Sequence, residues 1–356
     1  MTSVRDTCLL ILRLVVLGAV LWAAAPRAAE APPPLPQKLS ETGLFARGTR
    51  EIGPDKLAYA PQYPLWSDGA VKRRWLWLPP GTRIDAANPD AWQFPPGTRL
   101  WKEFGFGKPV ETRYIERLAD GSWRFAAYVW DADGRDARLA PAAGIASLPV
   151  RQAPGGRYTI PSRDDCLACH DAGAVPVLGV SALQLSPDRD PLAPHAGAPG
   201  EKLEDLATLS ARGLLEHLPP ELLSEPPRIA AATPRARAAL GYLHGNCGHC
   251  HNAGGPLAAL ELDLEQPARA SPAATAATLA TLVGVASEFR LEDVGTRVVA
   301  GADGESLLLA RMRSRDPLVQ MPPLGTAVSD REAIALVGHW IRDDLSAVQA
   351  RQEPSR

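Results

Sequence analysis

The sequence predicts a multidomain protein in which a mainly-β N-terminal domain, of the sandwich or barrel type, is followed by α-helical segments. Three observations predict this class. Seven of the nine tryptophans lie between Trp66 and Trp130, in short segments rich in aromatic and β-branched residues. Apolar residues recur at helical spacing after Pro161. The 35 prolines among 356 residues indicate many turns rather than one long helical array.

The chain begins with a segment typical of a secretory signal. Arg5 precedes an apolar run at residues 9–25, which one arginine interrupts, and small residues follow. We expect residues 1–31 to be a signal peptide with its cleavage region, and an uncleaved membrane anchor is the alternative. No later segment is long and apolar enough to cross a bilayer. The mature chain is therefore expected to be periplasmic, without a membrane span.

A proline-rich linker at residues 32–37 follows the signal, because consecutive prolines favour extended polyproline II and exclude helix. The β-rich domain is placed at residues 38–158. Its clearest strand signals are partly alternating aromatic and β-branched segments. They lie at residues 73–78, 111–115 and 123–130.

Turn signals separate these strands. The sequence Pro-Pro-Gly-Thr-Arg occurs at residues 79–83 and again at residues 95–99. Since Pro-Gly presets the central positions of a type II turn, each copy is predicted to carry a strand round a corner. Residues 131–136 begin like a calcium loop but lack the downstream glutamate, so an Asp-Gly hairpin turn is predicted there.

Three helices are predicted in the second half of the chain. Thr233 is a plausible cap for one of them, which also has proline near its first turn. Another opens with Ser329 and Glu332, spaced as a capping box. The predicted helices cover residues 201–218, 234–244 and 329–348.

Two Cys-x-x-Cys-His motifs occur at residues 166–170 and 247–251. This is the attachment signature of c-type haem, in which two thiols bond to the vinyl groups and the histidine ligates iron. In a helical turn, positions i, i+3 and i+4 lie on one side, so the three groups converge. We predict two covalent haem c groups, held by Cys166, Cys169 and His170 and by Cys247, Cys250 and His251.

The cysteine count supports this prediction. The chain has five cysteines, and the fifth, Cys8, lies in the signal segment, so none remains for a separate disulfide. Zinc and redox sites are the alternatives. A zinc ribbon brings its two cysteine pairs closer in sequence, and a thioredoxin-like motif needs no following histidine. For the first motif, a disulfide or an unoccupied site also stays open.

The second axial ligands are sought among methionines and histidines. Met321 lies in a Met-Pro-Pro loop that could hold a thioether over the second iron, whereas Met312, on a predicted helical run, is expected to fill a gap in the core. The first haem has no obvious partner. His217, His195, Met312 or no ligand are the options, and a five-coordinate haem would bind small ligands or peroxide.

Residues 234–345 resemble a class I cytochrome c domain. The resemblance implies that the first and last helices cross at Gly241, Tyr242 and Trp340. The interval between His251 and Met321 is longer than in small members of that family, so residues 256–300 are expected to form an insertion. The matching features are Gly241-Tyr242-Leu243, the second Cys-x-x-Cys-His motif, Met321-Pro322-Pro323, and Val337-Gly338-His339-Trp340-Ile341.

Nearly all of residues 40–345 also resemble a family of exported, largely uncharacterised dihaem cytochrome-containing proteins. The resemblance implies electron transfer and no particular substrate. It also divides the second half into a first haem-binding segment (159–232), a cytochrome c domain (233–348) and a tail (349–356). The features that carry it are Pro64-Leu65-Trp66-Ser67-Asp68, the Phe94-Pro95-Pro96-Gly97-Thr98 turn, and Leu178-Gly179 with Gln184-Leu185 after the first motif.

The expected function is electron transfer to or from a redox partner protein. One alternative is a dihaem peroxidase-like enzyme with a reactive first haem. Another is a ligand-binding β-domain that the haems couple to a separate dehydrogenase. Nucleic acid is not an expected partner, because the formal charge is −2 and no basic stripe occurs.

Overall fold

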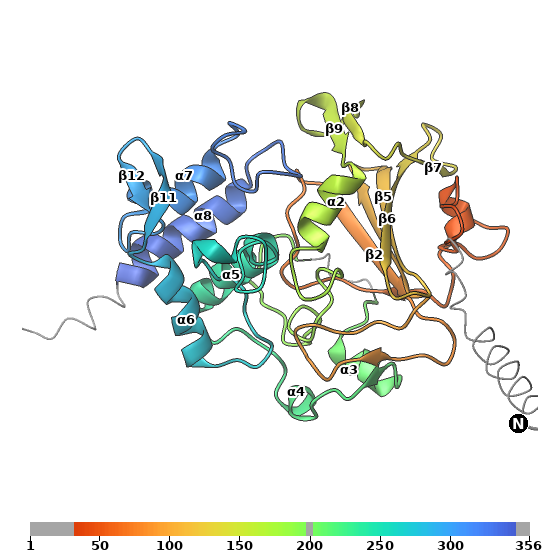
Figure 1. The fold of residues 1–356 in the computed structure, drawn as a ribbon, viewed down its shortest axis with the longest axis horizontal. Coiled ribbons are helices and arrows are strands. Elements are labelled where there is room, and N and C mark those ends of the chain that lie inside the picture. The colour runs from red at the N-terminus through yellow and green to blue at the C-terminus, as the bar shows by residue number, and fades with distance from the viewer. Residues whose placement is uncertain (1–31, 197–201, 347–356) are drawn as a thin grey trace, which may run out of the picture. The chain divides into compact units, whose positions relative to one another are not determined.

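The structure, a computed structural model, describes residues 32–196 and 202–346. The predicted signal peptide and the tail at residues 349–356 lie outside them. The main sheet is antiparallel, with strands in the order β1-β2-β4-β5-β6-β7 (Figure 1). Its strands are β1 (Leu57–Ala58), β2 (Val71–Trp77), β4 (Arg99–Gly105), β5 (Pro109–Arg117), β6 (Trp123–Trp130) and β7 (Ala137–Leu139). The three predicted strand segments are confirmed as β2, β5 and β6.

Three two-stranded sheets accompany the main sheet in the described residues. They pair β3 (Ile84–Asp85) with β10 (Leu215–Glu216), β8 (Ile145–Pro149) with β9 (Arg157–Ile160), and β11 (Ala286–Leu291) with β12 (Val294–Thr296). A β-rich region followed by helices is therefore confirmed.

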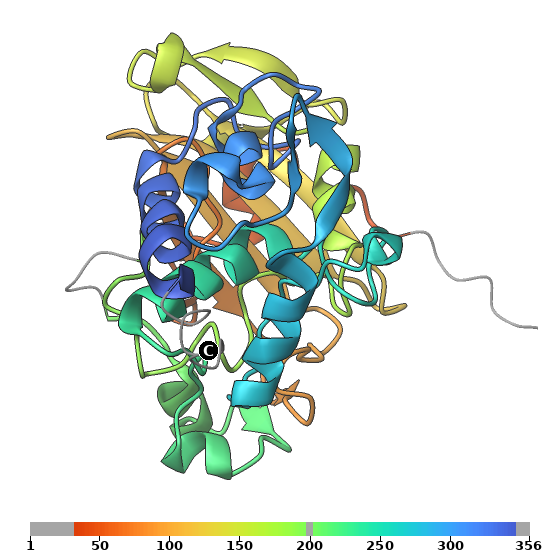
Figure 2. The same cartoon turned by 90° about the vertical axis from the view of Figure 1, so that its left-hand side faces the viewer.

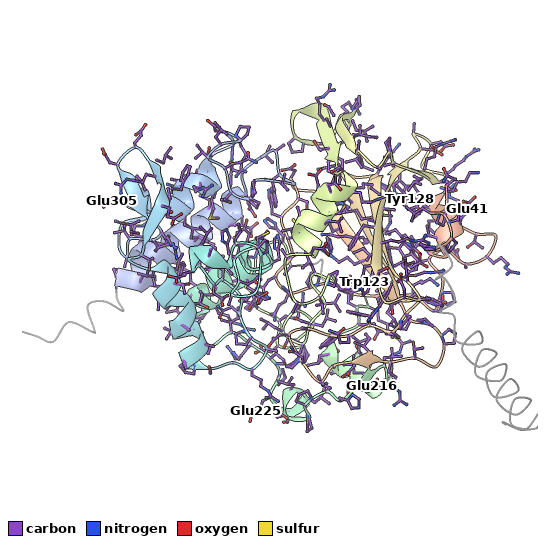
Figure 3. All side chains as sticks on the ribbon, in the orientation of Figure 1. Glu41, Trp123, Tyr128, Glu216, Glu225 and Glu305 are labelled. Atoms are coloured by element: carbon purple, nitrogen blue, oxygen red, sulfur yellow. The ribbon has the colours of Figure 1, made fainter. Side chains whose placement is uncertain are left out.

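Alternation along the strands gives the main sheet two different faces. The aromatic face carries Trp75, Trp101, Tyr114 and Tyr128, and packs against a segment that includes η1 (Leu39–Thr42). Figure 3 labels Glu41 of η1 and Tyr128, which lie together on this side of the sheet. The opposite face, here called the cationic face, carries Lys72, Arg74, Lys102 and Arg113.

Both predicted Pro-Pro-Gly-Thr-Arg turns are confirmed. In each copy, the threonine N–H donates to the carbonyl of the first proline at 3.1 Å. The glycines, Gly81 and Gly97, have φ of 76° and 87°, which a type II turn requires. The predicted Asp-Gly turn is also present, since the Gly134 N–H donates to the Asp131 carbonyl at 2.8 Å between β6 and β7.

The helices are short and concentrated in the second half of the chain. They are α2 (Arg163–His170), α3 (Leu206–Ala211), α4 (Glu221–Ser224), α5 (Pro234–Leu243), α6 (Pro272–Leu282), α7 (Leu307–Arg313) and α8 (Arg331–His339). Helix α5 continues as a π-helical turn, η3 (His244–Gly248), and α8 continues as η6 (Trp340–Leu345). Short 3₁₀ turns are η2 (Pro154–Gly156), η4 (Ala258–Leu260) and η5 (Asp303–Glu305). None of the helices in the described ranges is long and apolar enough to cross a bilayer.

Of the predicted helices, 234–244 is confirmed as α5, and Thr233 caps it by accepting a hydrogen bond from the Ala236 N–H at 3.0 Å. The prediction for residues 201–218 is wrong. Of the described residues in this range, only those of α3 are helical, and Gly213, with φ of 66°, follows the end of α3. Leu215 then pairs with Ile84 in a parallel bridge, so tertiary pairing overrides the helical spacing.

The start of the last helix also differs from the prediction. Helix α8 begins at Arg331, and Asp330 is its cap, accepting a hydrogen bond from the Ala333 N–H at 3.2 Å. The hydroxyl of Ser329 instead donates to the Arg313 carbonyl at 3.1 Å. The predicted capping box is therefore replaced by a simpler aspartate cap one residue later.

Helices α5 and α8 pack together, and Trp340 is buried at the start of η6. Gly241 has a different partner from the expected one. A Cβ atom at Gly241 would lie 2.0 Å from the ring of Tyr63, so this glycine admits a side chain from the β-rich region.

One hydrophobic core continues across both predicted domain boundaries. Leu76 and Leu100 of the main sheet belong to the same buried cluster as Leu240 and Trp340. The described residues from Leu35 onward accordingly belong to one compact unit. The expected insertion at residues 256–300 contains α6 and the β11–β12 hairpin, which Figure 2 shows on the side turned to the viewer.

Candidate cofactor site

The fold brings the two Cys-x-x-Cys-His motifs together. The ligand atoms of Cys169 in the first motif and of His249 and Cys250 in the second all lie within 4.8 Å of one another. All four motif cysteines are free thiols of intermediate burial. Sequence reasoning treated the motifs as two separate sites, because nothing in their spacing indicated that they meet.

Helix α2 holds the first motif in helical geometry. Ser162 and Asp165 form a capping box, in which the Ser162 hydroxyl accepts from the Asp165 N–H at 3.0 Å and the Asp165 carboxylate accepts from the Ser162 N–H at 2.9 Å. Because the helix is established before the motif begins, Cys166, Cys169 and His170 occupy one side of it.

The ring of His170 is fixed on both sides. Its Nδ1 lies 2.5 Å from the Pro176 carbonyl oxygen, and the ring centroid is 4.9 Å from that of Phe125 on β6. An Nδ1–H donated to a carbonyl leaves the Nε2 lone pair available to a metal. Burial lowers the pKa of His170 to about 4, although the Pro176 hydrogen bond opposes the shift. The imidazole is therefore neutral at neutral pH.

The second motif continues from α5 through the π-helical turn. The N–H groups of Cys250 and His251 both donate to the Cys247 carbonyl, at 3.0 and 2.9 Å, so a helical turn closes around the motif. Burial lowers the pKa of His251. Its Nδ1 is buried without a hydrogen-bond partner among the described residues.

Both motifs fit a c-type haem by the chemistry of their donor groups. Each offers two free thiols and one neutral imidazole on a helical turn. Burial raises the pKa of Cys247 to about 12, so this sulfur is a protonated thiol at neutral pH. His251 differs from His170 in one respect, because its Nδ1 has no hydrogen-bond partner among the described residues.

Asn246, which sequence reasoning missed, ties the second motif to the β-rich region. Its Oδ1 accepts from the Trp66 N–H at 2.7 Å, and its Nδ2 donates to the carbonyls of Pro64 and Tyr242 at 3.2 and 3.0 Å. One indication of this role was present in the sequence, a polar residue within the apolar run of α5 and its extension. The sequence could not identify the partners of Asn246, because Pro64 and Trp66 lie far from it along the chain.

Asp68 was also missed, and it holds the loop after Met321. Its carboxylate accepts from the N–H groups of Ala327 and Val328, at 2.9 and 3.0 Å from Oδ1. The Trp66 indole donates to the Val328 carbonyl at 3.2 Å. The segment 64–68 therefore joins the second motif to this loop.

Met321 and Met312 lie in different environments, and the core position predicted for Met312 is confirmed. Met321 is partly exposed, and its N–H donates to the Arg311 carbonyl at 3.0 Å. The Gln320 side chain donates to the carbonyls of Pro322 and Pro323, at 3.2 and 3.3 Å, and so steadies the loop. Met312 is 7% exposed and belongs to the hydrophobic core.

The two histidines considered for the first haem make contacts with carboxylates. The Nε2 of His195 lies 2.9 Å from Asp330, and its ring centroid lies 4.7 Å from that of Trp66. His217 is exposed, with its Nδ1 3.1 Å from Asp85. Neither His217 nor His195 therefore presents an unengaged ring in the described structure.

Comparisons of the chain with protein-family models, curated proteins and solved structures find no significant match. The functional argument therefore depends on the two motifs and on the groups that the fold places around them.

Proposed function

We propose that the protein is an exported, periplasmic dihaem c-type cytochrome that transfers electrons to or from a redox partner protein. The contact between the two motifs, at Cys169 and Cys250, carries the proposal. Electron tunnelling weakens steeply with distance. A chain that holds two redox groups at neighbouring cysteines is therefore suited to pass electrons between them and onward to a partner.

Each side chain has a distinct role in the proposal. Thioether bonds to Cys166 and Cys169 would hold the first haem, and His170 would ligate its iron. Cys247 and Cys250 would hold the second haem, and His251 and Met321 would ligate its iron. When bound, each iron supplies a one-electron couple whose potential depends on its ligands and surroundings.

The surrounding residues would orient these ligands. The Pro176 carbonyl fixes the His170 ring, and Asn246 fixes the backbone that leads into Cys247. The main sheet supplies Phe125 beneath His170. The β-rich region would therefore act as a scaffold for the haems, rather than as a separate catalytic module.

The test is a haem count on the mature protein, by mass and by the pyridine haemochrome spectrum. Two haems per chain are expected. The double variant Cys166→Ser/Cys169→Ser should keep one, and so should Cys247→Ser/Cys250→Ser. Cys8→Ser, in the predicted signal peptide, is the matched control and should keep both. A wild-type protein without covalent haem would rule out the proposal.

A metal site is the second candidate, favoured by the Cys169, His249 and Cys250 cluster. Zn²⁺ binds such nitrogen and sulfur donors, usually four in a tetrahedron. His249→Ala separates the candidates, because it should leave both haems attached in a cytochrome and should remove the metal from a zinc protein. Stoichiometric zinc in a haem-free wild-type protein would establish this second function.

A further inference from the structure

Three cations form a row across the cationic face of the main sheet. In the strand register, Arg74 of β2 lies opposite Lys102 of β4, and Lys102 lies opposite Arg113 of β5. Side chains at directly opposite positions project to the same face, about 5 Å apart at their Cβ atoms. Like charges placed in this way repel one another.

Only one carboxylate offsets this row in the described residues. Arg113 donates two hydrogen bonds to the fully buried Glu111, at 2.8 and 3.1 Å, and Glu111 also accepts from the Tyr158 hydroxyl at 2.7 Å. Lys102 and Arg113 both lie over the Phe104 ring, at 4.9 and 4.3 Å from its centroid.

Among the described residues, no carboxylate forms an ion pair or hydrogen bond with Arg74 or Lys102. Arg74 is only 8% exposed, yet no acceptor in the described part of the chain hydrogen-bonds its guanidinium. The Lys102 ammonium likewise has no hydrogen-bond acceptor in the described part of the chain. Burial, followed by the charge of Arg74, lowers the pKa of Lys102 well below its usual range. Because an uncompensated buried charge is costly, this face is suited to an anion.

The row lies beneath the first Cys-x-x-Cys-His motif. Phe125, on the same face at β6, contacts the His170 ring at a tilt of 49°, which places the end of α2 over the sheet. Lys102 and Arg113 both act electrostatically on His170, and Arg113 also acts on Cys166. An anionic group attached to this motif would therefore meet the cations.

We propose that Arg74, Lys102 and Arg113 form a carboxylate-binding face for the propionates of the haem attached at Cys166 and Cys169. This inference rests on the proposed function. Haem carries two propionate carboxylates, and guanidinium and ammonium groups bind carboxylates through charge-assisted hydrogen bonds. The proposal accounts for a buried Arg74 and a partly buried Lys102 that have no carboxylate partner in the described residues.

The experiment is a redox titration of Arg74→Gln and Lys102→Met. Arg73→Gln is the matched control, because Arg73 is adjacent in sequence but exposed on the opposite face, where it pairs with Glu103 at 2.6 Å. Loss of a cation beside a propionate disfavours the reduced haem. Each variant should lower the midpoint potential of the first haem by about 59 mV. This shift corresponds to about a tenfold decrease in the equilibrium constant for reduction. The other potential and both potentials of the control should not change.

The outcomes separate this inference from the proposed function. If both variants carry two haems and their potentials are unchanged, the inference is overturned but the proposed function is not. If the mass of the wild-type protein shows no haem at the first motif, the inference and the proposed function are both overturned. Lys102 is only partly buried, so Lys102→Met gives a result even if Arg74→Gln does not fold.

A free anion from solution could bind the three cations in place of the haem propionates. The wild-type potentials are therefore also measured with inorganic phosphate added at constant ionic strength. A face occupied by propionates predicts no response. A phosphate-dependent shift that both variants abolish would show that the face takes a free anion instead, and would overturn the inference.

Discussion

The side-chain amide oxygen of Asn246 accepts a hydrogen bond from the backbone N–H of Trp66 at 2.7 Å, between residues 180 positions apart. Asn246 directly precedes Cys247, so this bond connects the second motif to the segment that follows β1. The same segment reaches the loop after Met321 through Asp68. The position of the second motif is therefore set by the β-rich region as well as by its own helix.

Asn246→Ala should destabilise the protein by about 1–3 kcal/mol, because it leaves buried groups of Trp66 and Pro64 without partners. Asn246 is 3% exposed. Chemical denaturation measures the change in the free energy of unfolding. Asn88→Ala is the control, since Asn88 caps an exposed turn and its loss should cost much less. Equal costs for the two variants would contradict this account of Asn246.

Gly241→Ala should also destabilise the protein, by about 1–3 kcal/mol, because the new methyl group would overlap the Tyr63 ring. Thermal unfolding followed by circular dichroism measures the effect. Gly304→Ala is the matched control, since a Cβ at Gly304 meets nothing within 4 Å. If the two variants unfold at the same temperature, Tyr63 does not pack on α5 as described.

Glu111→Ala should cost about 3–5 kcal/mol, because it removes a buried carboxylate that pairs with Arg113 and accepts a hydrogen bond from the Tyr158 hydroxyl. Urea unfolding provides the measurement. Asp133→Ala removes an ion pair with Arg135 in which both side chains are exposed, and it should cost less than about 1 kcal/mol. A Glu111→Ala protein as stable as this control would refute the assigned role of the pair.

Met321→Ala should abolish the weak near-infrared absorption of a sulfur-ligated ferric haem, if the proposed ligation holds. It should also lower the potential of the second haem, because a thioether ligand raises it. Met312→Leu is the control and should keep the band, since Met312 packs in the core. A band that persists in Met321→Ala would mean that another group ligates the iron.

Lys72 provides a prediction of pH dependence. Burial, followed by the charges of Arg74 and Arg113, lowers its pKa to about 7, from about 10.5 in the unfolded chain. Between these values the unfolded state binds more protons at this residue, so its contribution to stability rises with pH. Wild-type protein should therefore gain stability relative to Lys72→Met between pH 7 and pH 10. Urea unfolding at both pH values tests this, and a constant difference would contradict it.

Local signals predicted the parts of the fold that depend on neighbouring residues. The strands β2, β5 and β6 followed from side-chain alternation, and α5 from Thr233 with proline in the first turn. The helix predicted for residues 201–218 was wrong, because Leu215 pairs with Ile84 from a distant segment. Apolar spacing alone could not reveal that pairing.

Some residues of the candidate site could likewise be predicted from local sequence, and others could not. Each Cys-x-x-Cys-His motif predicts its own donor set from sequence, because a helical turn depends only on residues three and four positions apart. Whether haem is attached stays a prediction. Asn246, Asp68 and the cationic row could not be found, since their partners lie on other elements.

The sequence by itself determined the chemistry of the two motifs, a set of four thiols and two imidazoles on helical turns. Only the tertiary structure decided that Cys169 meets Cys250, that Pro176 orients His170, and that α2 lies over a row of cations. The physical reason is that backbone hydrogen bonds define a turn locally. Contacts between distant segments depend instead on how one hydrophobic core packs across the main sheet and the helices.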